Sequence, residues 1–106
     1  MIQSLNNQNF QSILQENSIV LVDFYADWCG PCQALAPTLE NVSQKFDGKA
    51  LIGKVNIDKN PELSQDFQVR SIPALFYIKN GKIVDKQVGL QSETTISNNI
   101  TRLINN

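Results

Sequence analysis

Hydrophobic positions along the chain follow two periodicities, one typical of buried strands and one typical of helices. Residues 19–25 form an apolar, largely β-branched and aromatic run interrupted by Asp23, which predicts a central strand covered on both faces. Residues 50–57 predict a second core strand. Between them, apolar side chains recur at helical spacing over residues 31–46 and stop near Gly48, a glycine suited to a left-handed helix end. The pattern predicts a strand, helix, strand unit with a right-handed crossover.

Two shorter helices are predicted by the way they begin. Residues 9–16 carry apolar side chains at helical spacing and follow asparagines that can cap a helix. Asn60 precedes Pro61, a combination typical of an N-cap followed by the first helical position. In this second helix we expect Leu63 and Phe67 to face inward.

The last third of the chain predicts a hairpin and a final helix. Residues 74–78 and 82–88 predict two strands joined by the turn dipeptide Asn80-Gly81, so the strands are expected to be antiparallel and the sheet mixed. Ser92 begins a helix with many asparagines on one side. The apolar side chains expected on its buried side are Ile96, Ile100, Leu103 and Ile104.

Composition restricts the possible partners. The chain has 106 residues and a formal net charge of -1, with scattered lysines, so we expect one domain over residues 1–106 and no binding to nucleic acid or to an anionic membrane. Its first residues lack the basic and apolar regions of a secretory signal, and its apolar runs are too short to span a bilayer. We therefore expect a cytoplasmic protein.

The only two cysteines, Cys29 and Cys32, stand three positions apart, shortly after the first predicted core strand. At this spacing one sulfur can be exposed at the first turn of a helix while the other lies about one turn along, close enough to form a reversible disulfide. A structural staple is one alternative, but closing a loop of about four residues contributes only roughly 2 kcal/mol. Half of a zinc site is another, although zinc takes about four ligands and the chain has no other cysteine and no histidine. A pair of this kind beside a strand, helix, strand pattern favours redox chemistry.

The chemistry expected of this pair follows from its surroundings. In a reducing cytosol a paired dithiol is more often catalytic than structural, and without histidine no Ser–His or Cys–His nucleophile pair can form within the chain. We expect Cys29 to be the attacking sulfur, because it lies where a helix begins and its thiolate would face unpaired backbone donors. Gly30 would let a substrate backbone approach, and Pro31 presets a helical φ.

An ordered set of short motifs resembles the thioredoxin family over almost the whole chain. The motifs are residues 22–32 (VDFYADWCGPC), Ala36-Pro37, Asn56-Ile57-Asp58, Arg70-Ser71-Ile72-Pro73, Asn80-Gly81 and Val88-Gly89. The resemblance implies a thioredoxin fold, an α/β architecture with a central mixed five-stranded sheet flanked by four helices in three layers. It also implies a general protein-disulfide reductase in which Cys29 is the nucleophile and Cys32 the resolving thiol, the two forming a redox-active disulfide.

Two further catalytic residues follow from the resemblance. Asp23 is a carboxyl in an apolar strand, where desolvation raises its pKa. In thioredoxins the matching aspartate lies beneath the resolving cysteine and helps to deprotonate it, with a lysine nearby that Lys54 matches. A purely structural buried pair is the alternative.

The resemblance also implies a substrate platform. The Ile72-Pro73 bond would be a cis peptide facing the cysteines, with the backbone of Ile72 pairing with substrate, whereas an ordinary trans turn proline is the alternative. A mostly apolar docking rim would surround it, with Trp28 at the surface rather than in the core. The rim residues are Trp28, Ile72, Val88, Gly89 and Leu90.

Cofactor and partners follow from the resemblance as well. No cofactor is expected to bind the chain itself, and electrons are expected from NADPH through a flavin-dependent thioredoxin reductase. The implied substrates are disulfide-containing proteins such as ribonucleotide reductase, peroxiredoxins and methionine sulfoxide reductases. The chain is expected to be a monomer.

Three positions depart from the family pattern. Gln33 stands where thioredoxins usually carry lysine or arginine, so one positive charge near the thiolates is missing. Tyr25 replaces a frequent tryptophan, and Ser71 a frequent glycine.

An oxidant or isomerase on the same fold is the rival enzyme function, but it usually carries another dipeptide than Gly30-Pro31. A binding module with an incidental dithiol is the non-catalytic rival.

Overall fold

The structure is a computed structural model that describes residues 2–106. The elements formed by these residues, in chain order, are β1 (Gln3–Ser4), α1 (Phe10–Glu16), β2 (Ile19–Tyr25), α2 (Gly30–Lys45), β3 (Leu51–Asn56), α3 (Pro61–Asp66), β4 (Ala74–Lys79), β5 (Lys82–Val88) and α4 (Glu93–Asn105). Among residues 2–106, no helix has the length and apolar character needed to cross a membrane.

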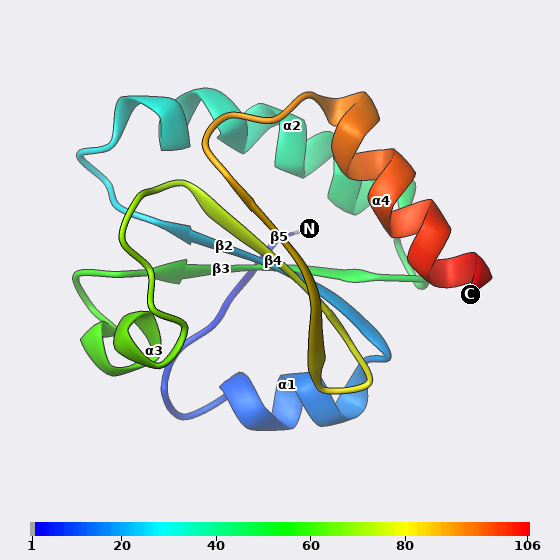
Figure 1. The fold of residues 1–106 in the computed structure, drawn as a ribbon, viewed down its shortest axis with the longest axis horizontal. Coiled ribbons are helices and arrows are strands. Elements are labelled where there is room, and N and C mark those ends of the chain that lie inside the picture. Colours follow the sequence, from blue (N-terminus) through cyan, green and yellow to red (C-terminus); the bar gives the residue numbers. More distant parts are fainter. Residues whose placement is uncertain (1) are drawn as a thin grey trace.

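The strands form one mixed sheet in the order β1-β3-β2-β4-β5. Strands β1, β3 and β2 are parallel, whereas β4 is antiparallel to both β2 and β5. Helices α2 and α4 lie on one face of the sheet, and α1 and α3 lie on the other (Figure 1). The three-layer α/β architecture implied by the resemblance is confirmed, and β2 is the central strand, as its apolar run predicts.

Alternation along β2 divides its side chains between two hydrophobic cores. Val20, Val22 and Phe24 belong to the core under α1 and α3, where the aromatic rings of Phe24 and Phe67 lie 5.1 Å apart. Leu21 points to the other face and belongs to the core under α2 and α4. Because side chains alternate along a strand, residues 23 and 25 share that second face. The central strand therefore presents its one carboxyl toward α2.

Turn chemistry is confirmed at both positions where the sequence predicts it. Asn80 and Gly81 have φ angles of 51° and 80°, as a two-residue hairpin turn requires, and they join the antiparallel strands β4 and β5. Gly48, with φ 79°, has the predicted left-handed conformation, but it lies in the turn after α2, whose C-cap residue is Phe46. Both turns are determined by residues next to one another in the chain.

Two helix caps differ from the prediction. Asn9 precedes α1 but makes no side-chain cap, because its Oδ1 accepts from the Asn6 N–H at 2.8 Å instead. Asn60 precedes α3 without a side-chain cap, because its Nδ2 donates to the Asn56 carbonyl at 3.1 Å. In both places the asparagine side chain hydrogen-bonds to a backbone group earlier in the chain, which competes with capping.

The buried face of α4 is rotated from the predicted one. Ser92 caps α4 as expected, accepting from the Thr95 N–H at 3.1 Å, and Ile96 and Ile100 are fully buried. Ile104, however, is 37% exposed, while Asn99 is only 8% exposed. Asn99 is buried because it reaches Asp85 of β5 at 3.5 Å, so the helix turns its polar position inward.

Strand β1 contains only Gln3 and Ser4, both exposed, and the hydrophobic pattern did not predict it. Its place is determined by pairing with Gly53 and Lys54 of β3.

Gly48→Ala is expected to lower the free energy of unfolding by about 1 kcal/mol, because an added Cβ meets open space and the only penalty is the left-handed backbone. Gly30→Ala is the matched control. Its Cβ also meets open space but the residue is helical, so the free energy of unfolding is expected to stay the same or rise. Urea unfolding of both oxidised variants tests this, and equal losses would contradict the backbone argument.

Candidate active site

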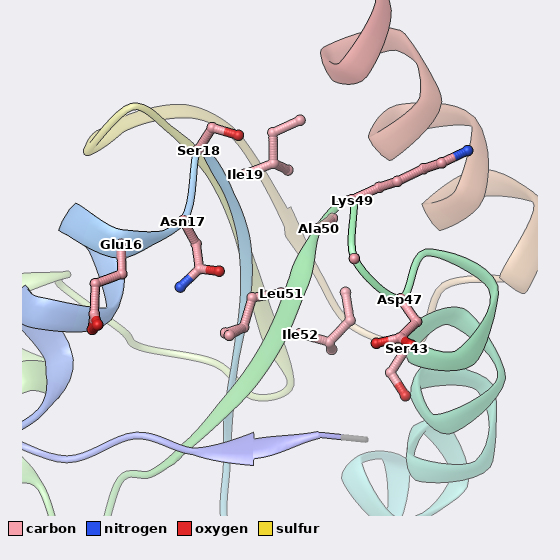
Figure 2. A pocket seen from close by; sticks show the side chains of 11 residues that line it. Glu16, Asn17, Ser18, Ile19, Ser43, Asp47, Lys49, Ala50, Leu51 and Ile52 are labelled. Atoms are coloured by element: carbon pink, nitrogen blue, oxygen red, sulfur yellow. The ribbon is translucent and has the colours of Figure 1, made fainter.

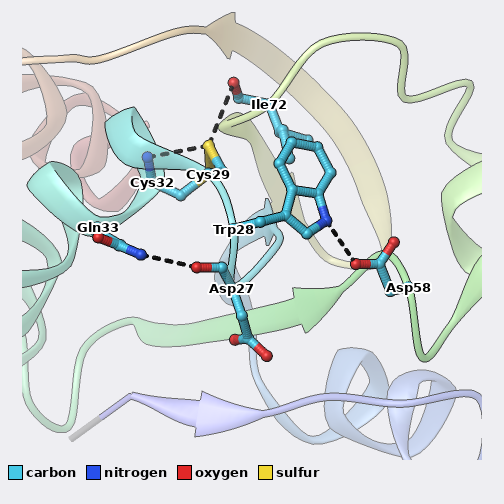
Figure 3. The surroundings of a disulfide bond; sticks show 7 residues. All are labelled: Asp27, Trp28, Cys29, Cys32, Gln33, Asp58 and Ile72. Atoms are coloured by element: carbon cyan, nitrogen blue, oxygen red, sulfur yellow. Dashed lines mark hydrogen bonds between the residues drawn. A yellow bond between two sulfur atoms is a disulfide. The ribbon is translucent and has the colours of Figure 1, made fainter.

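The cysteine pair lies where the chain leaves the centre of the sheet and begins α2. Cys29 is the N-cap residue of α2, and its Sγ accepts from the backbone N–H of Cys32 at 3.2 Å (Figure 3). The two cysteines form a disulfide, with their Cα atoms 5.3 Å apart. A sulfur in this position meets backbone donors that the first helical turn leaves unpaired and the positive end of the helix dipole.

Both cysteines are buried, which corrects the expectation that one sulfur is exposed. Cys29 and Cys32 are each 5% exposed as whole residues. They pack with Ala26, and the half-buried Ile72 lies against them. The Cys29 Sγ is 3.9 Å from the carbonyl oxygen of Ile72, to which a thiol could donate but a disulfide cannot. The segment that holds substrate in the sequence-based hypothesis therefore also covers the pair.

Gly30 and Pro31 occupy the first turn of α2, as predicted. Gly30 is exposed, and the space where its side chain would stand is open. Pro31 lies at a position whose backbone N–H would have no partner within the helix, so its missing donor costs nothing.

The Ile72-Pro73 bond is cis, and it lies beside the cysteines as the resemblance implies. The Pro73 carbonyl accepts from the Gly89 N–H at 2.8 Å, and Ala74 pairs with Val88. These contacts hold the end of β5 next to the loop before β4.

Three residues of the docking rim are exposed, whereas Ile72 and Gly89 are half-buried. Trp28 is 69% exposed, which confirms its predicted surface position, and Val88 and Leu90 are 48% and 57% exposed. The indole N–H of Trp28 donates to Asp58 at 2.8 Å (Figure 3). This role of Asp58 was not predicted, because the two residues are 30 positions apart and no local pattern links them.

Asp23 is buried under the active site. It is 5% exposed, and its Oδ1 has no hydrogen-bond partner among residues 2–106. Burial raises the pKa of Asp23 from 3.8 to about 7, and the positive charge of Lys54 opposes part of that rise. The carboxyl therefore changes its charge close to neutral pH.

Lys54 is the partner in register with Asp23 across β2 and β3. Within residues 2–106 the one ion pair is Arg102 with Asp85, so Lys54 forms none with Asp23. Its Nζ instead lies 5.6 Å from the centre of the Tyr25 ring. The tyrosine that departs from the family pattern thus holds this lysine by a cation–π contact.

One pocket joins the predicted catalytic residues. It has a volume of about 360 Å³, and Asp23, Lys54 and Cys32 all line it. Glu40 and Asp27 line the same pocket and were not predicted as site residues. Because Cys32 and the buried carboxyl share this space, a water molecule could connect them.

The Gln33 side chain binds a backbone carbonyl group and adds no charge near the sulfurs. Its Nε2 donates to the carbonyl oxygen of Asp27 at 2.8 Å (Figure 3). The neutral side chain therefore ties the loop before the cysteines to the first turn of α2, and it brings no positive charge to the sulfurs.

A second pocket, of about 350 Å³, lies at the opposite end of the sheet, where β2 begins and α2 ends (Figure 2). None of the predicted site residues lines it. No group of three or more histidine, cysteine, aspartate or glutamate side chains that could hold a metal ion occurs in the part of the chain that the structure describes.

Known proteins resemble this chain over most of its length. The thioredoxin family profile matches residues 1–102. A thioredoxin of Chlorobaculum thiosulfatiphilum is 44% identical over 95 residues, covering 89% of this chain and 88% of that protein. A thioredoxin of Haemophilus influenzae is 43% identical over 101 residues, covering 94% of each. A solved structure of a mutant thioredoxin from Halobacterium salinarum matches with a TM-score of 0.90 at 35% identity, covering 96% of this chain and 89% of the other.

The raised pKa of Asp23 predicts a dependence of stability on pH. Between about pH 4 and pH 7 the folded protein holds a proton that the unfolded chain has released, so the free energy of unfolding falls as pH rises through this window and levels off above it. Asp23→Asn has no charge to bury. The difference in free energy of unfolding between this variant and wild type should therefore change in favour of the variant by about 4 kcal/mol from pH 4 to pH 8.

Urea unfolding of the oxidised proteins measures this difference. Glu40→Gln is the control, because it removes an exposed carboxyl that lines the same pocket and should show no such growth. An Asp23→Asn advantage that stays constant between pH 4 and pH 8 would show that the carboxyl is not destabilised by burial.

Proposed function

This chain belongs to the thioredoxin family, and from that premise we propose how its residues divide the work of a protein thiol–disulfide oxidoreductase. The observation that carries the proposal is the position of the Cys29 sulfur at the N-cap of α2, within bonding reach of Cys32. It supports a general reductase of protein disulfides, in which the pair is a dithiol before each reaction and a disulfide after it. The similar proteins of Chlorobaculum thiosulfatiphilum and Haemophilus influenzae are thioredoxins, which agrees with this assignment.

Cys29 is the attacking residue in this proposal. Its thiolate attacks one sulfur of a substrate disulfide, a mixed disulfide forms, and the other substrate sulfur leaves as a thiolate that takes up a proton. The backbone N–H of Cys32, 3.2 Å from the Cys29 sulfur, and the helix dipole stabilise the attacking thiolate. Because Gln33 is neutral, these backbone contributions carry the stabilisation.

Cys32 then resolves the mixed disulfide. Its thiol loses a proton, the thiolate attacks the Cys29 sulfur, and the second substrate sulfur leaves reduced. The substrate gains two electrons and two protons in all, and the protein is left with its disulfide. We assign Asp23 as the group that accepts the Cys32 proton. Both residues line one pocket, and a carboxyl with a pKa of about 7 accepts protons near neutral pH. Lys54, held over Tyr25, stabilises the carboxylate form.

Substrate is held by the backbone of Ile72 and by the docking rim. The segment around Ile72 lies against the cysteines, and Trp28, Val88 and Leu90 offer exposed apolar surface around it. Gly89 also belongs to the rim, and its backbone N–H donates to the Pro73 carbonyl oxygen. A surface that binds backbone and apolar side chains suits many different disulfide segments.

The oxidised protein is re-reduced by a thioredoxin reductase in this proposal. The electrons come from NADPH through the flavin of that enzyme, and the chain itself binds no cofactor. Ribonucleotide reductase, peroxiredoxins and methionine sulfoxide reductases are the substrate classes that the family membership suggests. We further propose that residues 1–106 form one domain that acts as a monomer in the cytoplasm.

Single-cysteine variants test the assigned roles. With NADPH, a cognate thioredoxin reductase and a protein disulfide, wild type should turn over continuously, whereas Cys29→Ser and Cys32→Ser should not. Cys32→Ser should accumulate a mixed disulfide with substrate, seen by mass spectrometry, and Cys29→Ser should not. Absence of turnover in wild type would sink the proposed function, and trapping by Cys29→Ser instead would reverse the two roles.

The proton transfer is tested by the rate at which the mixed disulfide resolves. In single-turnover reactions Asp23→Asn should slow resolution by roughly tenfold to a hundredfold, so that the mixed disulfide accumulates transiently. The wild-type resolution rate should follow an apparent pKa near 7 that the variant lacks. Equal rates and equal pH profiles would leave Asp23 with only a structural role.

A further inference from the structure

A groove with two cationic side chains lies beside the proposed substrate platform. It has a volume of about 310 Å³ and is called the cationic groove below. The residues that line it are Gln68, Val69, Arg70, Ser71, Ala74, Lys86 and Val88. Two of its walls belong to the platform itself, because Ser71 directly precedes Ile72 and Val88 is part of the docking rim. The groove is therefore continuous with the place where substrate is proposed to bind.

The register of β5 brings the two cations together. Side chains alternate along this strand, so Lys86 and Val88 share one face while Asp85 points to the other, where it pairs with Arg102 of α4. The Nζ of Lys86 lies 5.3 Å from the centre of the Phe76 ring, which holds the lysine against the sheet. Arg70 reaches the groove from the segment between α3 and β4.

Both cations are available to a partner. Arg70 and Lys86 are exposed, and neither forms an ion pair within residues 2–106. The chain as a whole has a net charge of -1, so this positive charge is a local property of the groove. On the other flank of the cysteine pair stand the exposed carboxylates of Asp27 and Asp58, beside Trp28 (Figure 3). The two flanks of the platform thus carry opposite charges.

We propose that the cationic groove selects disulfide substrates that carry a carboxylate side chain a few residues from the attacked cysteine. The inference rests on the proposed function, because it concerns which substrates that reaction favours. An extended segment advances about 3.3 Å per residue, so a side chain roughly two to four positions beyond the cysteine reaches a groove next to the platform. The apolar walls at Val69, Ala74 and Val88 accommodate the stem of a glutamate, and Arg70 and Lys86 receive its carboxylate.

The expected selectivity is moderate and depends on salt. Exposed ion pairs are weak one at a time, so two cations acting together should favour a substrate by about threefold to tenfold. Screening should reduce the preference, since the Debye length shortens to about 3 Å at 1 M ionic strength. The acidic flank at Asp27 and Asp58 should disfavour a carboxylate on the opposite side of the cysteine.

A series of disulfide peptides tests the selectivity. Each contains one reactive disulfide and differs from the others by a single Glu or Gln, placed in turn at each of the four positions on either side of the attacked cysteine. The fully reduced protein is mixed with peptide in a single turnover, so no reductase takes part. The ratio of second-order rate constants for Glu and Gln peptides should be about threefold to tenfold at one or two positions on one side only, and should approach one at 1 M salt.

Charge-removing variants assign that ratio to the groove. In Arg70→Gln combined with Lys86→Gln the Glu-to-Gln ratio should fall to about one. Lys82→Gln is the matched control, because it removes an exposed lysine from the far end of the same strand and should keep both the ratio and the rate. A ratio that survives in the double variant, or that is the same at every peptide position, would overturn the proposal in favour of long-range steering.

Three other outcomes distinguish a failure of this inference from a failure of the function on which it rests. Equal reduction of Glu and Gln peptides by wild type would overturn the selectivity and leave the reductase assignment standing. Reduction of neither peptide would overturn both. If the double variant slows turnover with thioredoxin reductase but keeps the Glu-to-Gln ratio, the groove binds the reductase and the proposal for substrates is wrong.

Discussion

The hydrogen bond from the Cys32 N–H to the Cys29 sulfur is the interaction on which the rest of the site depends. It forms because β2, the central strand, ends only a few residues before α2 begins, so the sulfur lies at the unpaired donors of a helix N-terminus. The antiparallel pairing of Phe24 with Ala74 brings the start of β4 to the same end of the sheet. The cis peptide before Pro73 therefore stands beside the cysteines without any direct link in the chain.

Stability and chemistry make opposite demands on the centre of the sheet. A carboxyl in β2 costs free energy whenever it is charged, and the burial that causes this cost also brings the pKa of Asp23 to about 7. Lys54 moderates the cost from the neighbouring strand, and Tyr25 holds that lysine close without an ion pair. The stability of the fold is thus reduced at the position to which we assign the proton transfer from Cys32.

Much of the candidate site could be predicted because its signals are local. The spacing of Cys29 and Cys32, the carboxyl in an apolar strand and the surface position of Trp28 all agree with the structure. The predicted exposure of the Cys29 sulfur was wrong, because its cover comes from residue 72, far along the chain. For the same reason the role of Asp58 was not predicted. Asp58 lies in the loop after β3, and its hydrogen-bond partner Trp28 is 30 positions earlier in the chain.

By itself the sequence determined the strand over residues 19–25, the redox pair and the hairpin at Asn80-Gly81, because periodicity, spacing and turn chemistry depend on neighbouring residues. Only the tertiary structure decided the pairing of the two-residue strand β1, the inward turn of Asn99 and the meeting of Arg70 with Lys86. Each of these joins residues from separate elements, and its energy comes from contacts that exist only once the sheet has its strand order and register.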